Sequence, residues 1–305
     1  MKELIFAFLF TSSVNELDAP MLANSIRTFA GRFSKHPIWV LIPENEEILA
    51  TDVEEMLLSL NVQLIPFEIE DTALEFPFAG KVFASARAEA LAEEKASFLV
   101  WMDADSIVIN EPNELLLDDE TRLGGYRPVD HTLIGSRFDL PLDPFWTLIY
   151  EYCGVHQDAP FPMTTSVDRL VLRPYFNAGM SVVRPAHGLL QSWRDNFARL
   201  YRQPFFERFY NEDLLYKVFI HQAVLAGTIL STLKQEELQE FPHTVNYPLH
   251  MHSQHSLTRR VKRLNDVVIC RHDTFFNDPD WRERIHIDEP LKSWLEAQAR
   301  VQVRK

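Results

Sequence analysis

Short apolar runs alternate with longer amphipathic stretches over residues 4–102 of the chain. The apolar runs have the length of buried strands and are bounded by polar or turn-forming residues. They cover 4–10, 38–42, 62–67 and 98–102. Helical spacing or helix-favouring composition marks the segments between them, at 17–30, 45–58 and 81–94. Strands that alternate with helices in this way predict an α/β fold with a mainly parallel sheet and helices on both faces.

The second half of the chain is less regular, and we expect it to continue the same domain. Residues 173–184 contain two strand-like runs that meet at 177–179, and helical patterns follow at about 186–202 and 212–225. The 9 glycines and 18 prolines are spread without a linker-like cluster. We therefore expect one domain over 1–280 and a helical tail at 281–305.

Composition narrows the class of protein. Of the 305 residues 46 % are apolar, which is enough for a sizeable core, and 30 Lys and Arg against 44 Asp and Glu give a net charge of −14. An acidic chain is a poor partner for nucleic acid, because phosphate contacts need a basic face. The two cysteines are too few for a disulfide framework and suggest reduced thiols in the cytoplasm.

The sequence predicts no membrane span. No apolar run reaches the roughly 20 residues that a spanning helix needs. The run 4–10 could instead belong to a short signal peptide, but the small-residue cleavage pattern is missing. We interpret it as the first buried strand.

Two aspartates interrupt the apolar pattern at one point. Asp103 and Asp105 follow the run 98–102, and the apolar run 107–109 resumes directly after them. Side chains two apart in an extended segment point to the same side, so both carboxylates could meet one hard cation. A solvated turn after a strand is the alternative, because Asp is a common turn residue. The brief interruption between two buried runs favours the metal site.

A second polar cluster, Tyr-Phe-Asn-Ala-Gly, lies at 175–179, directly before the apolar run 180–183. Gly179 would allow the backbone close to a ligand, and Asn177 offers hydrogen-bond donors and an acceptor for hydroxyl groups. A bulge or hairpin corner is the alternative interpretation.

We expect the ligand site at one edge of the predicted sheet. Ligands of such sheets bind beyond the carboxyl ends of the strands, so Thr11, Ser12 and the two aspartates belong to the same edge. Neither a glycine-rich dinucleotide loop nor a Walker-type phosphate loop occurs in the sequence.

Together with further segments, these motifs make the chain similar to glycosyltransferase family 8, which includes bacterial lipooligosaccharide galactosyltransferases and glycogenin. In order, 81–87 resembles the family's helix with a donor-contacting arginine, and 101–108 resembles its D-x-D strand end. Residues 175–179 resemble its Y-F-N-[SA]-G, and 221–226 resemble its D-Q-x-x-L-N. A weaker match at 267–272 is similar to a late strand that ends in a metal-binding histidine.

The resemblance implies the GT-A fold of nucleotide-diphospho-sugar transferases, a Rossmann-like mixed sheet flanked by helices. It divides 1–280 into a nucleotide-binding half, 1–110, and a sugar and acceptor half, 111–280. It also implies a nucleotide-sugar donor, with UDP expected, and a divalent metal, Mn²⁺ or Mg²⁺. Carried over by position, the metal ligands are Asp103, Asp105 and His272.

The other site residues follow from the resemblance in the same way. Thr11 and Ser12 are expected near the nucleoside, and Arg87 is expected to clamp the donor. Asn177 and Gln222 are expected to face the sugar as the catalytic residues. The resemblance thus implies a metal-dependent hexosyltransferase that retains the anomeric configuration, and we expect it to be soluble and cytoplasmic. Its acceptor is an unidentified carbohydrate, lipid-linked molecule or protein.

The chain departs from the family pattern at two places. In place of the family's acidic residues on either side of the glutamine, this chain has His221 and Ala223. These replacements favour an alternative function, a non-catalytic protein that binds nucleotide sugars or glycans. The family's glycine and lysine after the metal histidine are also missing. Candidates for the missing positive charge are Arg271 and a basic cluster, which consists of Arg259, Arg260, Lys262 and Arg263.

Two other classes of protein fit the sequence less well. A nucleotidyltransferase that makes nucleotide sugars typically begins with a glycine-rich basic loop, which the first strand lacks. A structural protein without a ligand would leave Asp103 and Asp105 unexplained.

Two weaker patterns have more than one interpretation. The histidines at 250, 252 and 255 have a metal-like spacing, but no cysteine is near in sequence, and we interpret them as loop residues near the donor. In the tail, Leu291, Trp294 and Leu295 predict a short basic amphipathic helix. This helix could contact a membrane that holds a lipid-linked acceptor, or dock on the domain.

Overall fold

A mixed sheet of seven strands forms the centre of the computed structural model, which describes residues 3–11, 16–44 and 50–303. The strand order is β10-β6-β9-β4-β1-β2-β3, in which β9 runs antiparallel to its neighbours β4 and β6. The mixed α/β sheet expected from the sequence is confirmed. The strands are β1 (Leu4–Leu9), β2 (Ile38–Pro43), β3 (Gln63–Phe67), β4 (Phe98–Met102), β6 (Gly124–Tyr126), β9 (Met180–Val183) and β10 (Leu238–Glu240).

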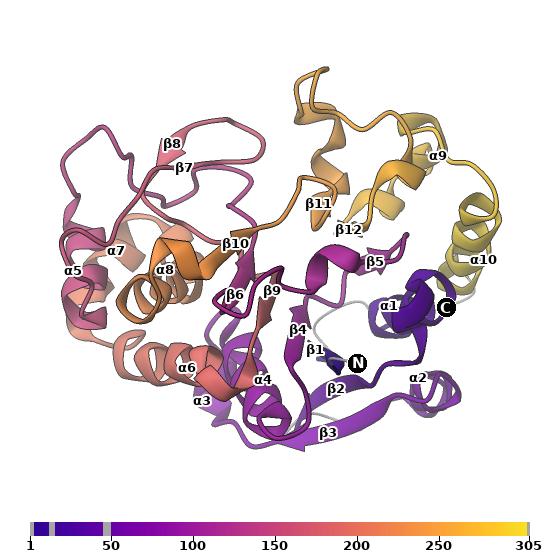
Figure 1. Ribbon diagram of the computed structural model, residues 1–305, viewed down its shortest axis with the longest axis horizontal. Coiled ribbons are helices and arrows are strands. Elements are labelled where there is room, and N and C mark those ends of the chain that lie inside the picture. The colour runs from indigo at the N-terminus through magenta and orange to yellow at the C-terminus, as the bar shows by residue number, and fades with distance from the viewer. Residues whose placement is uncertain (1–2, 12–15, 45–49, 304–305) are drawn as a thin grey trace.

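Helices cover both faces of this sheet (Figure 1). One face packs against α4 (Ala79–Ala92), α5 (Pro144–Cys153), α6 (Leu189–Leu200), α7 (Pro204–Glu212) and α8 (Leu214–Thr232). The other face packs against α1 (Asp18–Phe29) and α2 (Thr51–Ser59). Strand β1 shows why the sheet is buried on both sides, since Ile5 and Ala7 belong to the first core while Phe6 and Phe8 belong to the second.

A small second sheet carries the late part of the chain. Its strands are β5 (Ser106–Val108), β11 (Tyr247–Pro248) and β12 (Ile269–Arg271), with β12 between the other two. Because β5 begins shortly after β4 ends, this sheet brings residues 271–273 next to the aspartates. A separate hairpin of β7 (Met163–Thr164) and β8 (Val171–Leu172) lies beyond α5.

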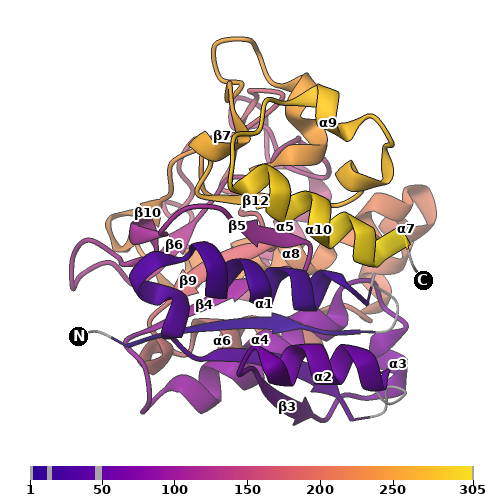
Figure 2. The ribbon, with the colours of Figure 1, turned by 90° about the vertical axis from the view of Figure 1, so that its right-hand side faces the viewer.

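The C-terminal tail docks on the domain. It contains α9 (Trp281–Arg284) and α10 (Leu291–Val303), and α10 lies alongside α1 (Figure 2). Leu291 and Leu295 are buried, and the indole N–H of Trp294 donates a hydrogen bond of 2.7 Å to Oδ1 of Asn24. The apolar side chains that we considered for membrane contact are therefore used in packing against the fold.

Element boundaries differ from the sequence predictions at a few points. The helix predicted at 45–58 is α2, whose first residue is Thr51, and 45–49 lie outside the described residues. The helix predicted at 212–225 continues to Thr232. Within the described ranges, α8 is the one helix long and apolar enough to cross a membrane, and 61 % of its apolar stretch is buried inside the fold. A short helix, α3 (Asp71–Leu74), precedes α4.

Candidate active site

Parallel pairing brings the ends of β1 and β4 to the same edge of the sheet, with Phe8 opposite Met102. Thr11, which follows β1, and Asp103, which follows β4, both line a cavity of about 930 Å³. This larger cavity extends to the segment 74–78 before α4. Ser12, the other residue expected near a nucleoside, lies outside the described residues.

A smaller cavity of about 270 Å³ adjoins the larger one. It is lined from the turn before β9 by Asn177 and Gly179 and from α8 by His221 and Gln222. Five residues line both cavities, and we call them the waist: Phe78, Lys81, Asp103, Asp105 and Asp273. The predicted site residues on β1, β4, β9 and α8 therefore come together around two joined cavities.

The aspartate pair sits in a turn. We expected an extended segment, but the backbone N–H of Ser106 donates to the carbonyl of Asp103 at 3.2 Å and closes a tight turn. Both carboxylates nevertheless face both cavities. The solvated-turn interpretation does not hold for Asp105, which is half-buried and whose Oδ1 is buried without a hydrogen-bond partner among the described residues.

Burial dominates the electrostatics of Asp105. Loss of hydration and the neighbouring Asp103 charge raise the pKa of Asp105 to about 6, although Arg271 and Lys81 act in the opposite direction. Two close carboxylates with one unpartnered buried oxygen are a suitable donor set for a hard divalent cation.

Lys81 supplies the positive charge at the waist. Its Nζ lies 2.7 Å from Oδ2 of Asp103, and its side chain is only 9 % exposed. The ring of Phe78 lies below the ammonium at 4.9 Å, and Phe78 itself has a left-handed backbone with φ of 61°. A left-handed aromatic residue is strained, and such residues occur most often at functional sites.

Arg87, predicted to clamp the donor, is exposed and is not among the described residues that line either cavity. Arg87 lies six positions after Lys81 on α4. This spacing places Arg87 about 120° around the helix axis and about 9 Å along the axis from Lys81. On α4 the side chain that lines both cavities is Lys81, and the role expected of Arg87 stays a prediction.

The turn before β9 approaches the aspartates closely. The backbone N–H of Asp103 donates to the carbonyl of Gly179 at 2.7 Å, and a Cβ on Gly179 would lie 2.8 Å from Oδ2 of Asp103. The close approach expected at this glycine is therefore an approach to Asp103. Oδ1 of Asn177 accepts from the N–H of Gly179 at 2.8 Å, which fixes the amide at the edge of the smaller cavity.

Gln222 reaches the same turn from α8. Its Oε1 accepts a hydrogen bond of 3.0 Å from the backbone N–H of Ala178. Its Nε2 is buried and has no partner in the part of the chain that the structure describes. Because Gln222 lines the smaller cavity, this amide offers hydrogen-bond donors near the site.

His221 is a buried neutral imidazole. Its Nδ1 lies 2.9 Å from the carbonyl of Val218, which accepts, so the proton is on Nδ1 and Nε2 is an acceptor. Burial, and secondly the charge of Lys81, lower its pKa well below the usual value. The ring of Phe78 lies 4.8 Å from it. Ala223 is buried in the core and is not among the described lining residues, so only the replacement at His221 affects the cavities.

His272 lies beside Asp105 through the backbone, where its N–H donates to the carbonyl of Asp105 at 2.8 Å. Its side chain is buried, and His272 is not among the described residues that line either cavity. Its Nε2 lies 3.9 Å from Oδ1 of Asp18. Burial lowers the pKa of His272 to about 4, so the ring is neutral at pH 7, as a metal ligand must be. Its Nε2 is buried and has no hydrogen-bond partner among the described residues.

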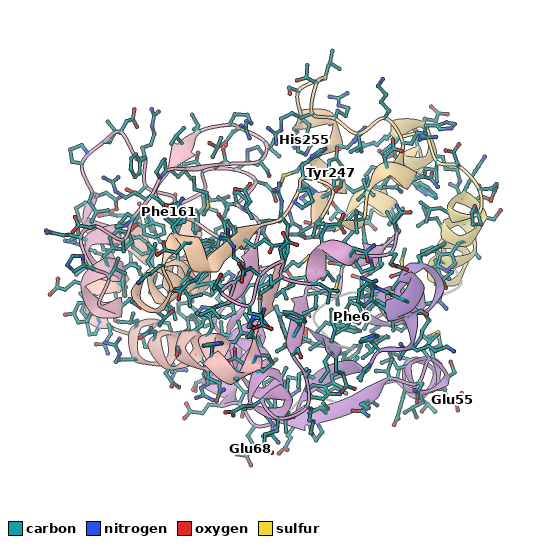
Figure 3. The ribbon with its side chains drawn as sticks, in the orientation of Figure 1. Phe6, Glu55, Glu68, Phe161, Tyr247 and His255 are labelled. Carbon is teal, nitrogen blue, oxygen red and sulfur yellow. The ribbon has the colours of Figure 1, made fainter. Side chains whose placement is uncertain are left out.

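The loop histidines do not form a metal cluster. His250 lines the smaller cavity, while Nδ1 of His252 shares a hydrogen bond of 2.8 Å with the hydroxyl of Tyr247. The ring of His255 stacks on Tyr247 with centroids 5.0 Å apart (Figure 3). Over the described residues, no group of three His, Cys, Asp or Glu side chains is arranged to hold a metal ion.

The motifs left out several lining residues. Arg271, one of the candidates for the missing positive charge, lines the smaller cavity and forms an ion pair of 2.5 Å with the buried Asp130. The other candidate, the basic cluster, is not among the described residues that line either cavity. Asp273 follows the expected metal histidine directly, so the sequence carried a signal for it. Lys81 is the first residue of the motif at 81–87. No pattern in the sequence indicates Phe78, because its position depends on its backbone conformation.

The mixed sheet flanked by helices has the architecture of the GT-A fold. Residues 6–229 match the family model described as the Rhodobacterales glycosyltransferase domain, and the chain belongs to this family. The protein is therefore an enzyme of the transferase class. No curated protein matches the sequence.

The fold agrees with one solved structure, and a second structure has a lower similarity. The structure of a galactosyltransferase, LgtC, in complex with donor and acceptor sugar analogues has a TM-score of 0.52 at 13 % identity, with 96 % of this chain and 95 % of that chain covered. Mouse xyloside xylosyltransferase 1 in its apo form has a TM-score of 0.45 at 14 % identity, with 88 % and 96 % covered. These similarities concern the architecture and not the substrates.

Proposed function

We propose that the protein transfers a hexose from a UDP-sugar to an acceptor hydroxyl in a reaction that needs Mn²⁺ or Mg²⁺ and retains the anomeric configuration. The donor class and the stereochemistry rest on the resemblance to glycosyltransferase family 8. The metal requirement rests on that resemblance and on the charges of the site.

The observation that carries this proposal is the excess of carboxylates at the waist. Asp103, Asp105 and Asp273 line both cavities, and Lys81 is the cation that lines both. A nucleoside in the larger cavity and a sugar in the smaller one would put the diphosphate between these carboxylates. Because like charges repel strongly in a partly buried site, an anionic donor needs a further cation there.

We assign the metal to Asp103 and Asp105. The unpartnered Oδ1 of Asp105 supports this assignment, and His272, whose buried Nε2 also has no hydrogen-bond partner among the described residues, stays the expected third ligand. When bound, the metal acts as a Lewis acid that neutralises charge on the departing diphosphate.

The sugar side of the proposal uses residues on β9 and α8. The amide N–H groups of Gln222 and the neutral Nε2 of His221 can bind hydroxyl groups of the hexose, as donor and acceptor respectively. The bond between the anomeric carbon and the β-phosphate oxygen breaks, and UDP leaves with the electron pair. A new bond forms from the anomeric carbon to the acceptor oxygen, whose proton passes to the oxygen of the departing diphosphate.

The smaller cavity also offers an entrance for the acceptor. His131, Leu133, His250 and Met251 line it on the side of the loops. We propose that the acceptor enters there, and its chemical class stays open among carbohydrate, lipid-linked molecule and protein. The cytoplasmic location is likewise a proposal, supported by the two buried free thiols Cys153 and Cys270.

One observation favours a second function, the binding of nucleotide sugars without turnover. The neutral imidazole of His221 stands where the family resemblance expects a carboxylate. If that carboxylate is essential for chemistry, this chain would hold a donor and not cleave it.

Release of UDP from a panel of UDP-hexoses distinguishes the two functions. With Mn²⁺ we expect one donor to be hydrolysed slowly, since water can replace an absent acceptor, and no UDP release in EDTA. Binding of the same donor without UDP release, with or without added acceptor sugars, would favour the binding protein. Equal UDP release in Mn²⁺ and EDTA would remove the metal from the proposal.

A further inference from the structure

Lys81 is held in a built setting at the waist. The ammonium contacts the Asp103 carboxylate on one side at 2.7 Å and the Phe78 ring on the other at 4.9 Å. Its side chain is 9 % exposed. In the described part of the chain, Asp103 is its only ion-pair partner. A buried lysine that is directed at one carboxylate, between two ligand cavities, has a more specific role than a surface charge.

Two of the three waist aspartates, Asp103 and Asp105, differ in their hydrogen-bond partners. Oδ2 of Asp103 is engaged by Lys81, whereas Oδ1 of Asp105 has no partner within the described ranges. A divalent cation needs both carboxylates, and it would bring two positive charges to within a few ångströms of the Lys81 ammonium. The repulsion between them is strong at this level of burial. The ammonium and the cation therefore weaken each other's binding to Asp103.

Lys81 has an alternative partner within reach when a donor binds. It lines both cavities, and it is the only Lys or Arg that does so among the described residues. A lysine ammonium is a compact charge on a flexible stem of four carbons, so it can turn from one anion to another without backbone movement. The diphosphate of a donor that spans the waist is such an anion.

We propose that Lys81 competes with the divalent cation for Asp103, and that the displaced ammonium binds the donor diphosphate. This inference rests on the proposed function, because it needs a metal and a nucleotide at the waist. Lys81 then has two opposite effects. It weakens the binding of the metal alone and strengthens the binding of the nucleotide together with the metal.

Lys81→Met tests this directly, because methionine keeps much of the side-chain volume over Phe78 and removes the charge. The control is Lys95→Met, an equal loss of charge at an exposed lysine whose Nζ lies over the Trp39 ring at 5.5 Å, away from the cavities. For each protein the dissociation constant of Mn²⁺ alone is measured by titration calorimetry. The dissociation constant of UDP is then measured at saturating Mn²⁺.

We expect Lys81→Met to bind Mn²⁺ alone about tenfold or more tightly, and to bind UDP with Mn²⁺ about tenfold or more weakly, as expected for a charged contact. Lys95→Met should match the wild type in both measurements. Lys81→Arg, which keeps the charge, should restore the UDP affinity, and Lys81→Gln repeats the first test if the methionine variant does not fold. A merely structural role for Lys81 cannot produce effects of opposite sign.

Each other outcome overturns the inference. If Lys81→Met leaves both constants unchanged, or weakens both, Lys81 does not compete with the metal, while the proposed function stands as long as the wild type binds UDP with Mn²⁺. If no variant binds Mn²⁺ with or without UDP, the inference and the metal in the proposed function fall together.

Discussion

Oε1 of Gln222 accepts a hydrogen bond of 3.0 Å from the backbone N–H of Ala178, and this contact ties α8 to the turn before β9. Ala178 precedes Gly179, whose carbonyl accepts from the N–H of Asp103 at 2.7 Å. One short chain of contacts therefore links the helix that lines the smaller cavity to the backbone of Asp103 at the waist. The oxygen of the Gln222 amide has a structural role, and its nitrogen is available to a ligand.

Substitutions at Gln222 should separate these two roles. Gln222→Ala leaves the buried N–H of Ala178 without an acceptor, so we expect the free energy of unfolding to fall by about 1–3 kcal/mol. Gln222→Glu keeps an oxygen at this place but loses the N–H donors, so UDP release should fall at least about tenfold with a smaller loss of stability. Chemical denaturation and the UDP-release assay measure the two effects. Equal stability losses in both variants would contradict the assignment.

Gly179→Ala should impair the site through a steric effect. The new Cβ would lie 2.8 Å from Oδ2 of Asp103 and 2.9 Å from Oδ1 of Asn177, so both side chains must move. We expect weaker binding of UDP with Mn²⁺, measured by calorimetry. Gly154→Ala is the control, because its Cβ meets nothing within 4 Å but its φ of 72° strains an alanine. The control should lose about 1 kcal/mol of stability and keep its UDP affinity, and a Gly179→Ala variant with wild-type affinity would refute the predicted clash.

Glu89 should make the stability of the fold depend on pH. This buried carboxyl on α4 accepts from the backbone N–H of Gln191 at 2.8 Å, and burial raises its pKa from 4.5 to about 7. The folded protein therefore holds a proton that the unfolded chain releases, and stability falls as the pH rises from about 4.5 to 7. Glu89→Gln removes this contribution.

The stability of Glu89→Gln relative to the wild type should therefore rise by about 3 kcal/mol between pH 4.5 and 8, since one pKa unit corresponds to about 1.4 kcal/mol. Urea unfolding at several pH values measures it. Glu93→Gln, at an exposed position at the end of α4, should leave the difference from the wild type constant. A constant difference for Glu89→Gln as well would show that the carboxyl is ionised in the folded protein throughout this range.

His221→Asp tests whether the position needs an imidazole. The imidazole is neutral and presents Nε2 as an acceptor, and a carboxylate also accepts. We expect UDP release to be retained or increased. His221→Asn, which has the shape of Asp without the charge, separates the effect of charge from that of side-chain size. Complete loss of UDP release in a folded His221→Asp variant would show that the imidazole has a role of its own.

The sequence predicted the sheet well because its central strands are buried on both faces. Runs such as 98–102 are apolar throughout, and they leave little choice of structure. The parallel register then brought Thr11 and Asp103 to one edge, as expected from the topology alone. Positions that depend on side-chain direction were predicted less well.

Arg87 illustrates that limit, whereas the metal role of His272 stays a prediction. The order of the motifs along the chain indicated α4 and β12. Which turn of α4 faces the cavities depends on where the helix begins and ends. In the structure Lys81 lines the cavities, and Arg87 does not. His272 is adjacent to Asp105 through the backbone, while its side chain lies 3.9 Å from Asp18. The left-handed backbone of Phe78 could not be predicted, because packing and not residue type stabilises it.

The most direct test of the account is the thermal stability of the wild type and Asp105→Asn with UDP, GDP and CDP, each with and without Mn²⁺. A ligand at a hundred times its dissociation constant adds about 2.7 kcal/mol to the free energy of unfolding, which a melting curve detects readily. The account predicts that UDP raises the melting temperature of the wild type only with Mn²⁺, and that Asp105→Asn folds but gains nothing. Stabilisation of the wild type by no nucleotide, or an equal gain in Asp105→Asn, would contradict a metal-dependent nucleotide site at the waist.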